Sequence, residues 1–110
     1  MRFPKFPYWR SEKHLRNVAS LPCQLCGVDG QTQASHSNAS IHGKGRSIKA
    51  SDQFTASLCV SCHSMIDQGS QLSREDRSQL WLQAFRKTVR ELLRRELWPA
   101  KVAVPEILEV

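Results

Sequence analysis

Two pairs of cysteines in this 110-residue chain have the spacing of a metal-binding site. The first pair is Cys23-Gln-Leu-Cys26 and the second is Cys59-Val-Ser-Cys62. Each C-x-x-C sequence brings two thiolates together in one tight turn, and two such turns supply the four sulfur ligands of a tetrahedral Zn²⁺ ion. The cysteines therefore predict a structural zinc ion. Because four thiolates saturate it, the histidine that follows directly, His63, is free for other chemistry.

Disulfide bonds are the alternative use of an even number of cysteines, and they are typical of secreted proteins. The N-terminal segment lacks the apolar stretch of a signal peptide, and no run of about 18 apolar residues is present that could span a membrane. We therefore expect metal-bound thiolates in a reducing cytoplasm and no membrane partner.

Two histidines and an aspartate have the types and spacing needed for phosphodiester hydrolysis. That reaction needs a base that deprotonates water and a divalent cation that neutralises the charge growing on the phosphoryl group. His63 and Asp67 are four residues apart, so on a helix they share one face and can hold one ion together. His36, in the segment between the two cysteine pairs, is the candidate base. We expect Mg²⁺ or Mn²⁺ at this second site.

The charge of the chain favours a polyanionic partner, of which nucleic acid is the commonest. The formal net charge is +6 and the pI is about 9.6. A glycine-rich stretch around residues 43–46 predicts an exposed loop, and Lys44, Arg46 and Lys49 are the residues expected to bind phosphates there. DNA is thus the predicted partner, with an affinity that salt weakens.

The elements that must position these residues follow from local patterns. Ser11 is a plausible N-cap for a short helix, Gly69 a plausible helix end, and Ser73 opens the clearest amphipathic helix. The 32 residues between Cys26 and Cys59 exceed the roughly 15–20 of an ordinary zinc ribbon and leave room for a β-hairpin. The predicted elements are a helix over 12–19, strands over 31–37 and 54–58, and helices over 60–68 and 71–98.

The corresponding organisation has four parts. Residues 1–20 form a basic arm and short helix, and residues 21–72 form the zinc-bound core. Residues 73–98 form an amphipathic helix that packs on the core, and residues 99–110 form a tail.

The stretches Cys23-Gln-Leu-Cys26, Ala34-Ser-His36, Gly43-Lys-Gly45 and Leu58-Cys-Val-Ser-Cys-His63 through Asp67 resemble zinc-containing HNH endonucleases of the His-Me finger (ββα-metal) class. Within that class, the chain is similar to small phage and prophage HNH proteins, the group that contains the YbcO-like and Ref-like nucleases. The resemblance covers about residues 20–72. It implies an α+β fold with a zinc-stabilised, treble-clef-like ββα-metal core, DNA cleavage with a Mg²⁺-type cofactor, and the cytoplasm of a bacterial host.

The resemblance also implies residue roles. His36 falls on the general base and His63 on the ligand of the catalytic metal. The position of the middle Asn of the family signature is occupied by Phe54, so Asn38 or Asp52 is the candidate for its orienting role. The residue four after the helix histidine, often a second His, is Asp67, whose carboxylate suits Mg²⁺.

Simpler interpretations stay open for each of these residues. His36 could be a hydrogen-bonded structural histidine, His63 a surface histidine, and Asp67 a solvated helix residue, while Asn38 and Asp52 could be ordinary turn formers. A non-catalytic zinc module that binds nucleic acid needs only the cysteines and the positive charge. A protein-interaction adaptor would use the Leu- and Trp-rich helix, whose apolar stripe fits either a monomer core or a homodimer. His14 and His42 are expected at the surface.

Overall fold

Three α-helices and two antiparallel strands make up the fold in the part of the chain that the computed structural model describes, residues 6–69 and 71–105. The predicted α+β class is confirmed. In chain order the elements are α1 (Glu12–Ala19), β1 (Thr32–His36), the 3₁₀ turn η1 (Ser40–His42), β2 (Thr55–Cys59), α2 (Val60–Gln68) and α3 (Arg74–Arg94).

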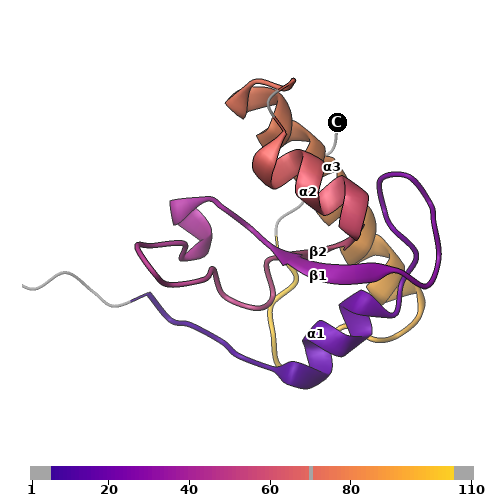
Figure 1. Ribbon diagram of the computed structural model, residues 1–110. Coiled ribbons are helices and arrows are strands. Elements are labelled where there is room, and N and C mark those ends of the chain that lie inside the picture. Colours follow the sequence, from indigo (N-terminus) through magenta and orange to yellow (C-terminus); the bar gives the residue numbers. More distant parts are fainter. Residues whose placement is uncertain (1–5, 70, 106–110) are drawn as a thin grey trace, which may run out of the picture.

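The two strands form a hairpin with helices on both sides. Thr32 pairs with Cys59 and His36 with Thr55, so the first strand ends opposite the start of the second. Figure 1 shows α1 below the strands and α2 above them, with the long α3 running alongside. Because α2 follows β2 without a loop, the last cysteine pair lies where the strand becomes a helix.

Side-chain caps explain where the helices begin. The hydroxyl of Ser11 accepts a hydrogen bond from the backbone N–H of His14, and the hydroxyl of Ser73 accepts one from Asp76. Such bonds satisfy N–H groups that have no partner within the helix. The backbone N–H of Gly69 closes α2 on the carbonyl of Met65. The bounds of α1 and α2 match the predicted ones because each depends on residues only a few positions away, whereas α3 begins three residues after the predicted start at 71.

The long helix is shorter than predicted: α3 ends at Arg94, not at residue 98. Glu96 has a left-handed backbone with φ 58°. Its N–H donates a hydrogen bond to the carbonyl of Leu93, and the N–H of Leu97 donates one to the carbonyl of Leu92. This is the hydrogen-bond pattern of a Schellman motif, and Leu97 packs against Leu92 as that motif requires. The apolar periodicity does not reveal this end because a glutamate occupies the position that glycine usually takes. No helix among the described residues is long and apolar enough to cross a membrane.

The core lies between β2 and α3 and includes the metal-binding segments. Leu58, Phe85 and Val89 are buried in the same cluster as Cys23 and Cys59. A smaller cluster of Val18, Leu21 and Leu92 joins α1 to α3. The apolar stripe of α3 therefore packs within the chain. The indole N–H of Trp81 donates to the carbonyl of Ser35, which ties α3 to the residue before His36.

The prediction that His14 lies at the surface is wrong. Its imidazole is 2% exposed and lies between the rings of Trp9 and Trp98, with centroid distances of 5.2 and 5.4 Å. Neither ring nitrogen has a hydrogen-bond partner among the described residues. Burial lowers the pKa of His14, and the carboxylate of Asp52 opposes this only in part. The aromatic arm that covers His14 is remote from α3 in sequence, which explains why local patterns missed it.

The free energy of unfolding is expected to fall as the pH is lowered from about 7 to 5, where a histidine with an ordinary pKa becomes protonated. Because burial lowers the pKa of His14 in the folded chain, the unfolded chain binds more protons over this range and acid favours unfolding. Urea titrations across this range should show a shallower pH dependence for His14→Phe. Burial also lowers the pKa of His42, so part of the pH dependence of the unfolding free energy should remain in that variant. Parallel slopes for the two proteins would contradict this assignment.

Candidate functional site

The four cysteines converge on one point between the hairpin and α2. Their sulfur atoms all lie within 4.8 Å of one another, and the Sγ atoms of Cys26 and Cys59 are 3.7 Å apart. Two thiolates on a tetrahedral zinc ion with bonds of about 2.3 Å are separated by about 3.8 Å, whereas a disulfide requires about 2.05 Å. The four thiols are thus arranged as a set of metal ligands such as zinc requires.

Backbone amides prepare both cysteine pairs for a cation. The N–H of Cys26 donates to the Sγ of Cys23, and the N–H of Cys62 to the Sγ of Cys59, each at 3.4 Å. Burial opposes the ionisation of Cys23, but backbone N–H groups led by that of Cys26 outweigh it and lower its pKa to about 6. Burial and the three neighbouring sulfurs raise the pKa of Cys62. A divalent cation at the centre would remove this obstacle to four thiolates.

Most of the predicted catalytic and DNA-binding residues line a single pocket of about 270 Å³. His36 reaches it from the end of β1, and His63 and Asp67 reach it from α2. Two of the three predicted phosphate-binding residues are there as well, while Arg46 does not line it and is exposed at the loop tip. The complete lining is Ala34, His36, Ser37, Asn38, Lys44, Lys49, His63 and Asp67.

His36 is held by a buried carboxylate. Its Nε2 lies 2.8 Å from Oδ1 of Asp52, which is 3% exposed. Burial by itself would raise the pKa of Asp52, but hydrogen bonds from His36, the backbone of Ser11 and the guanidinium of Arg10 outweigh it and lower the pKa. An ionised Asp52 accepts the Nε2 proton, which leaves the lone pair of His36 on Nδ1. Asp52 is not among the residues that line the pocket, so it acts on the pocket only through its contact with His36.

His63 and Asp67 lie side by side as their spacing predicts. Nε2 of His63 is 3.0 Å from Oδ2 of Asp67, and its Nδ1 is 2.8 Å from Oε1 of Gln33. When Gln33 accepts the Nδ1 proton, a lone pair on Nε2 faces the carboxylate, an arrangement that needs a proton or a cation between them. Adjacent ligands of an octahedral ion with bonds of about 2.1 Å are about 3 Å apart, which is also the separation of Nε2 and Oδ2 here.

Asn38 and Asp52 were both candidates for orienting the base, and the structure separates them. Asp52 contacts His36, whereas the side-chain N–H of Asn38 points to Oδ1 of Asp67 at 3.4 Å. Asn38 is therefore the neighbour of Asp67 and not of His36. Phe54, at the position of the usual signature Asn, stacks on His42 with a centroid distance of 4.2 Å. His42 is half-buried and hydrogen-bonded to Ser37, contrary to the expected surface position.

The N-terminal arm contributes residues that the sequence did not indicate. The hydroxyl of Tyr8 donates to the carbonyl of Gly43, and the guanidinium of Arg10 donates to the carbonyls of Lys49 and Ala50 as well as to Asp52. Gly43 has φ 97°, and a Cβ there would lie 2.8 Å from the ring of Phe6. Through these contacts the arm holds the basic loop, residues 43–49, against the core. No local signal predicts contacts between segments about 40 residues apart.

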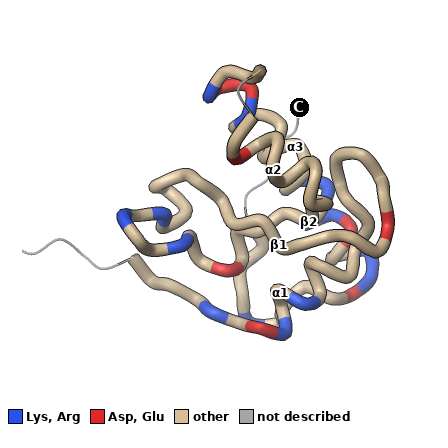
Figure 2. Tube along the Cα trace, viewed as in Figure 1, with Lys and Arg blue, Asp and Glu red and all other residues tan. Residues whose placement is uncertain are grey.

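Positive charge gathers on this loop. Figure 2 shows the Lys and Arg residues of the 43–49 segment together at one end of the molecule, beside the N-terminal arm. Lys44 and Lys49 line the same pocket as His36 and His63, and the ammonium group of Lys44 donates to the carbonyl of Gly45 at 3.1 Å. A phosphate placed there would meet cations from the loop on one side and imidazole groups from the hairpin and α2 on the other.

For the DNA cleavage that the sequence predicts, replacing Asp52 by Asn is expected to lower kcat by about 10- to 100-fold, the usual effect of losing a partner that orients a functional histidine. The amide keeps the size of the carboxylate but not the charge that fixes the Nε2 proton and stabilises the imidazolium. Initial cleavage rates over a range of DNA concentrations should show the change in kcat, with KM nearly constant. Asp29→Asn, which removes an exposed carboxylate, is the matched control. Equal activities of the two variants would contradict an orienting role.

Comparisons with known proteins place the chain in a family without assigning an activity. No curated protein and no solved structure matches it. The profile of the family described as "Protein of unknown function (DUF968)" matches residues 1–92, which include the arm, both cysteine pairs, the hairpin and most of α3. This match covers most of the sequence. The chain belongs to the DUF968 family.

Proposed function

We propose that this protein is a metal-dependent endonuclease of the HNH, ββα-metal type that hydrolyses DNA phosphodiester bonds. The observation that carries the proposal is one pocket lined by a carboxylate-held histidine, His36, a histidine–carboxylate pair, His63 and Asp67, and two lysines. The succession of β1, β2 and α2 supports the ββα assignment, since the hairpin supplies the base and the helix supplies the metal ligands.

In this mechanism His36 accepts a proton from water through Nδ1 as the water attacks phosphorus. Asp52 holds the ring by the Nε2 hydrogen bond and stabilises the imidazolium that forms. Lys44 and Lys49 orient the phosphate and lower the cost of its negative charge. His63 and Asp67 would hold the divalent cation, which supplies charge neutralisation for the phosphoryl group and the leaving oxygen.

The zinc site has a structural part in the proposal. Cys59 and Cys62 flank the start of α2, directly before His63, and Cys23 and Cys26 precede the strand that carries His36. A zinc ion joining these pairs fixes the hairpin and the helix relative to each other. The distance between the base and the metal-binding pair would then depend on the four thiolates.

A plasmid-nicking assay tests the proposal directly. The purified protein is incubated with supercoiled plasmid at low salt, with Mg²⁺, Mn²⁺, Ca²⁺ or EDTA, and its zinc content is measured in parallel. We expect conversion to open-circular or linear DNA with Mg²⁺ or Mn²⁺ and none with EDTA. Zinc-loaded protein that shifts DNA on a gel but never cuts would favour a non-catalytic nucleic-acid-binding module. Protein that neither binds nor cuts would favour an adaptor.

A further inference from the structure

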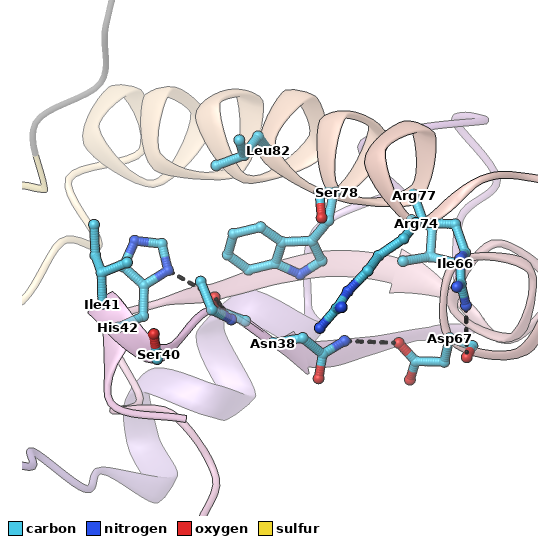
Figure 3. A pocket seen from close by; sticks show the side chains of 13 residues that line it. Asn38, Ser40, Ile41, His42, Ile66, Asp67, Arg74, Arg77, Ser78 and Leu82 are labelled. Atoms are coloured by element: carbon cyan, nitrogen blue, oxygen red, sulfur yellow. Dashed lines mark hydrogen bonds between the residues drawn. The ribbon is translucent and has the colours of Figure 1, made fainter. Parts of the chain in front are cut away.

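We propose that a second pocket, next to the histidine site, binds an unpaired nucleotide adjoining the scissile phosphate, so that the preferred substrate is DNA with a single-stranded segment. This inference rests on the proposed function for the identity of the ligand as DNA. The second pocket has a volume of about 590 Å³ and lies between the 37–42 segment and the first turns of α3 (Figure 3). We call it the flanking pocket.

The flanking pocket is continuous with the histidine site. Ser37, Asn38 and Asp67 line both pockets. Asn38 and Asp67 are also hydrogen-bonded to each other, so their side chains form the shared wall. A strand whose scissile phosphate lies beside His63 and Asp67 therefore has its neighbouring nucleotide at the entrance to the flanking pocket.

The flanking pocket carries positive charge suited to a phosphate. Arg74 and Arg77 line it from α3, and Figure 3 shows Arg74 crossing it towards Asn38. Within residues 6–69 and 71–105 the Arg74 side chain makes no ion pair or hydrogen bond. Arg77 donates to the backbone carbonyl of Asp67 at 3.3 Å, and its charge is not paired with a carboxylate there. Two guanidinium groups without an acidic partner favour an anionic ligand.

The remaining lining suits a nucleobase. Ile41 contributes an apolar side chain that is 77% exposed, and Trp81 and Leu82 contribute apolar surface from α3. Ser40 and Ser78 add hydroxyl groups that can hydrogen-bond a base edge. Proteins usually bind single strands by combining cations for the backbone with aromatic side chains on which bases stack, and Trp81 belongs to this lining.

The shape of the flanking pocket selects an unpaired nucleotide. Its volume falls in the range of small-molecule sites, about 300–1,000 Å³, and a duplex is far too wide to enter it. Bases within a duplex expose only their edges, because their faces are stacked on neighbours. A base that contacts Ile41 and Leu82 with its face must therefore be unpaired.

Equilibrium binding tests the inference without relying on cleavage. Fluorescence anisotropy with a fluorescein-labelled oligo-dT strand and a labelled hairpin duplex is measured in Ca²⁺ at fixed salt. Arg74→Ala is paired with Lys87→Ala, which removes an exposed cation of the same helix, and Ile41→Ala with Val60→Ala, which removes an exposed apolar side chain outside the pocket. All four changes are at exposed positions, and melting temperatures verify folding.

We expect the wild type to bind the single strand more tightly than the duplex. Arg74→Ala and Ile41→Ala should each weaken single-strand binding about 5- to 10-fold, while the two controls change it less than twofold. Equal affinity for the two DNAs, or equal effects of pocket and control variants, would overturn the inference even if the protein nicks plasmid. A protein that shows the expected selectivity but never cuts would overturn the proposed nuclease function and support the inference that the flanking pocket binds single strands.

Discussion

Removal of a metal ion from the four-cysteine site of Cys23, Cys26, Cys59 and Cys62 is expected to unfold the protein. Structural zinc sites bind with apparent free energies of about 10–16 kcal/mol, which equals or exceeds the roughly 5–15 kcal/mol net stability of a typical domain. Two of the four cysteines belong to the main apolar cluster, so their separation would also open the core. Circular dichroism during titration with a strong chelator should show loss of helix together with release of one zinc ion per chain.

Single substitutions test whether this loss of stability comes from the thiolates. Cys62→Ser is expected to lower zinc content and melting temperature sharply, because a hydroxyl is a poor zinc ligand at neutral pH and Cys62 lies at the start of α2. Ser64→Ala, at an exposed position two residues further along the same helix, is the matched control and should melt close to the wild type. If the chelator-treated protein keeps a cooperative melt at the original temperature, the stability of the fold does not depend on a metal at the four thiols.

Replacing His36 by Ala is expected to lower the rate of plasmid nicking by about 10²- to 10⁴-fold, the usual contribution of a general base. The side chain is only partly buried and its main contact is Asp52, so the fold and the affinity for DNA should change little. Nicking rates at saturating Mg²⁺, together with gel-shift affinity and melting temperature, separate these effects. Added imidazole should restore part of the activity by occupying the space left by the ring.

His63 and Asp67 should behave differently from His36 in the same assay. His63→Ala and Asp67→Asn remove groups placed to hold the cation, so they should raise the concentration of Mg²⁺ or Mn²⁺ needed for half-maximal rate. His36→Ala should leave that concentration nearly unchanged. If His36→Ala nicks as fast as the wild type, the base has been assigned to the wrong residue. If all three variants retain full activity, the pocket is not the active site.

The structure gives the basic arm a role that is independent of DNA contact. Although the arm is basic, the guanidinium of Arg10 is hydrogen-bonded to Asp52 and to loop carbonyls. Through Asp52 the arm reaches His36, and through Tyr8 it reaches the carbonyl of Gly43 beside Lys44. The arm therefore connects His36, the proposed base, to the loop that carries Lys44.

Much of this protein followed from its sequence alone, where the determining interactions are local. The two C-x-x-C turns, the caps at Ser11 and Ser73, and the end of α2 at Gly69 each depend on residues within about four positions. The pairing of His63 with Asp67 has the same origin, because residues four apart share a helix face. A tetrahedral metal adds one long-range constraint that ligand spacing reveals, so the hairpin between the cysteine pairs was predictable too.

Tertiary structure decided the rest. The choice of Asp52 over Asn38 as the partner of His36 and the contact of Gln33 with His63 join residues 16 and 30 positions apart. The contact with Trp98 that helps to bury His14 joins residues 84 positions apart. Such contacts arise when the arm, the hairpin and α3 pack together, and no periodicity or capping pattern encodes them. Short sequence motifs thus identify the residues that can do chemistry, whereas the orientation of their side chains depends on packing between elements distant in the chain.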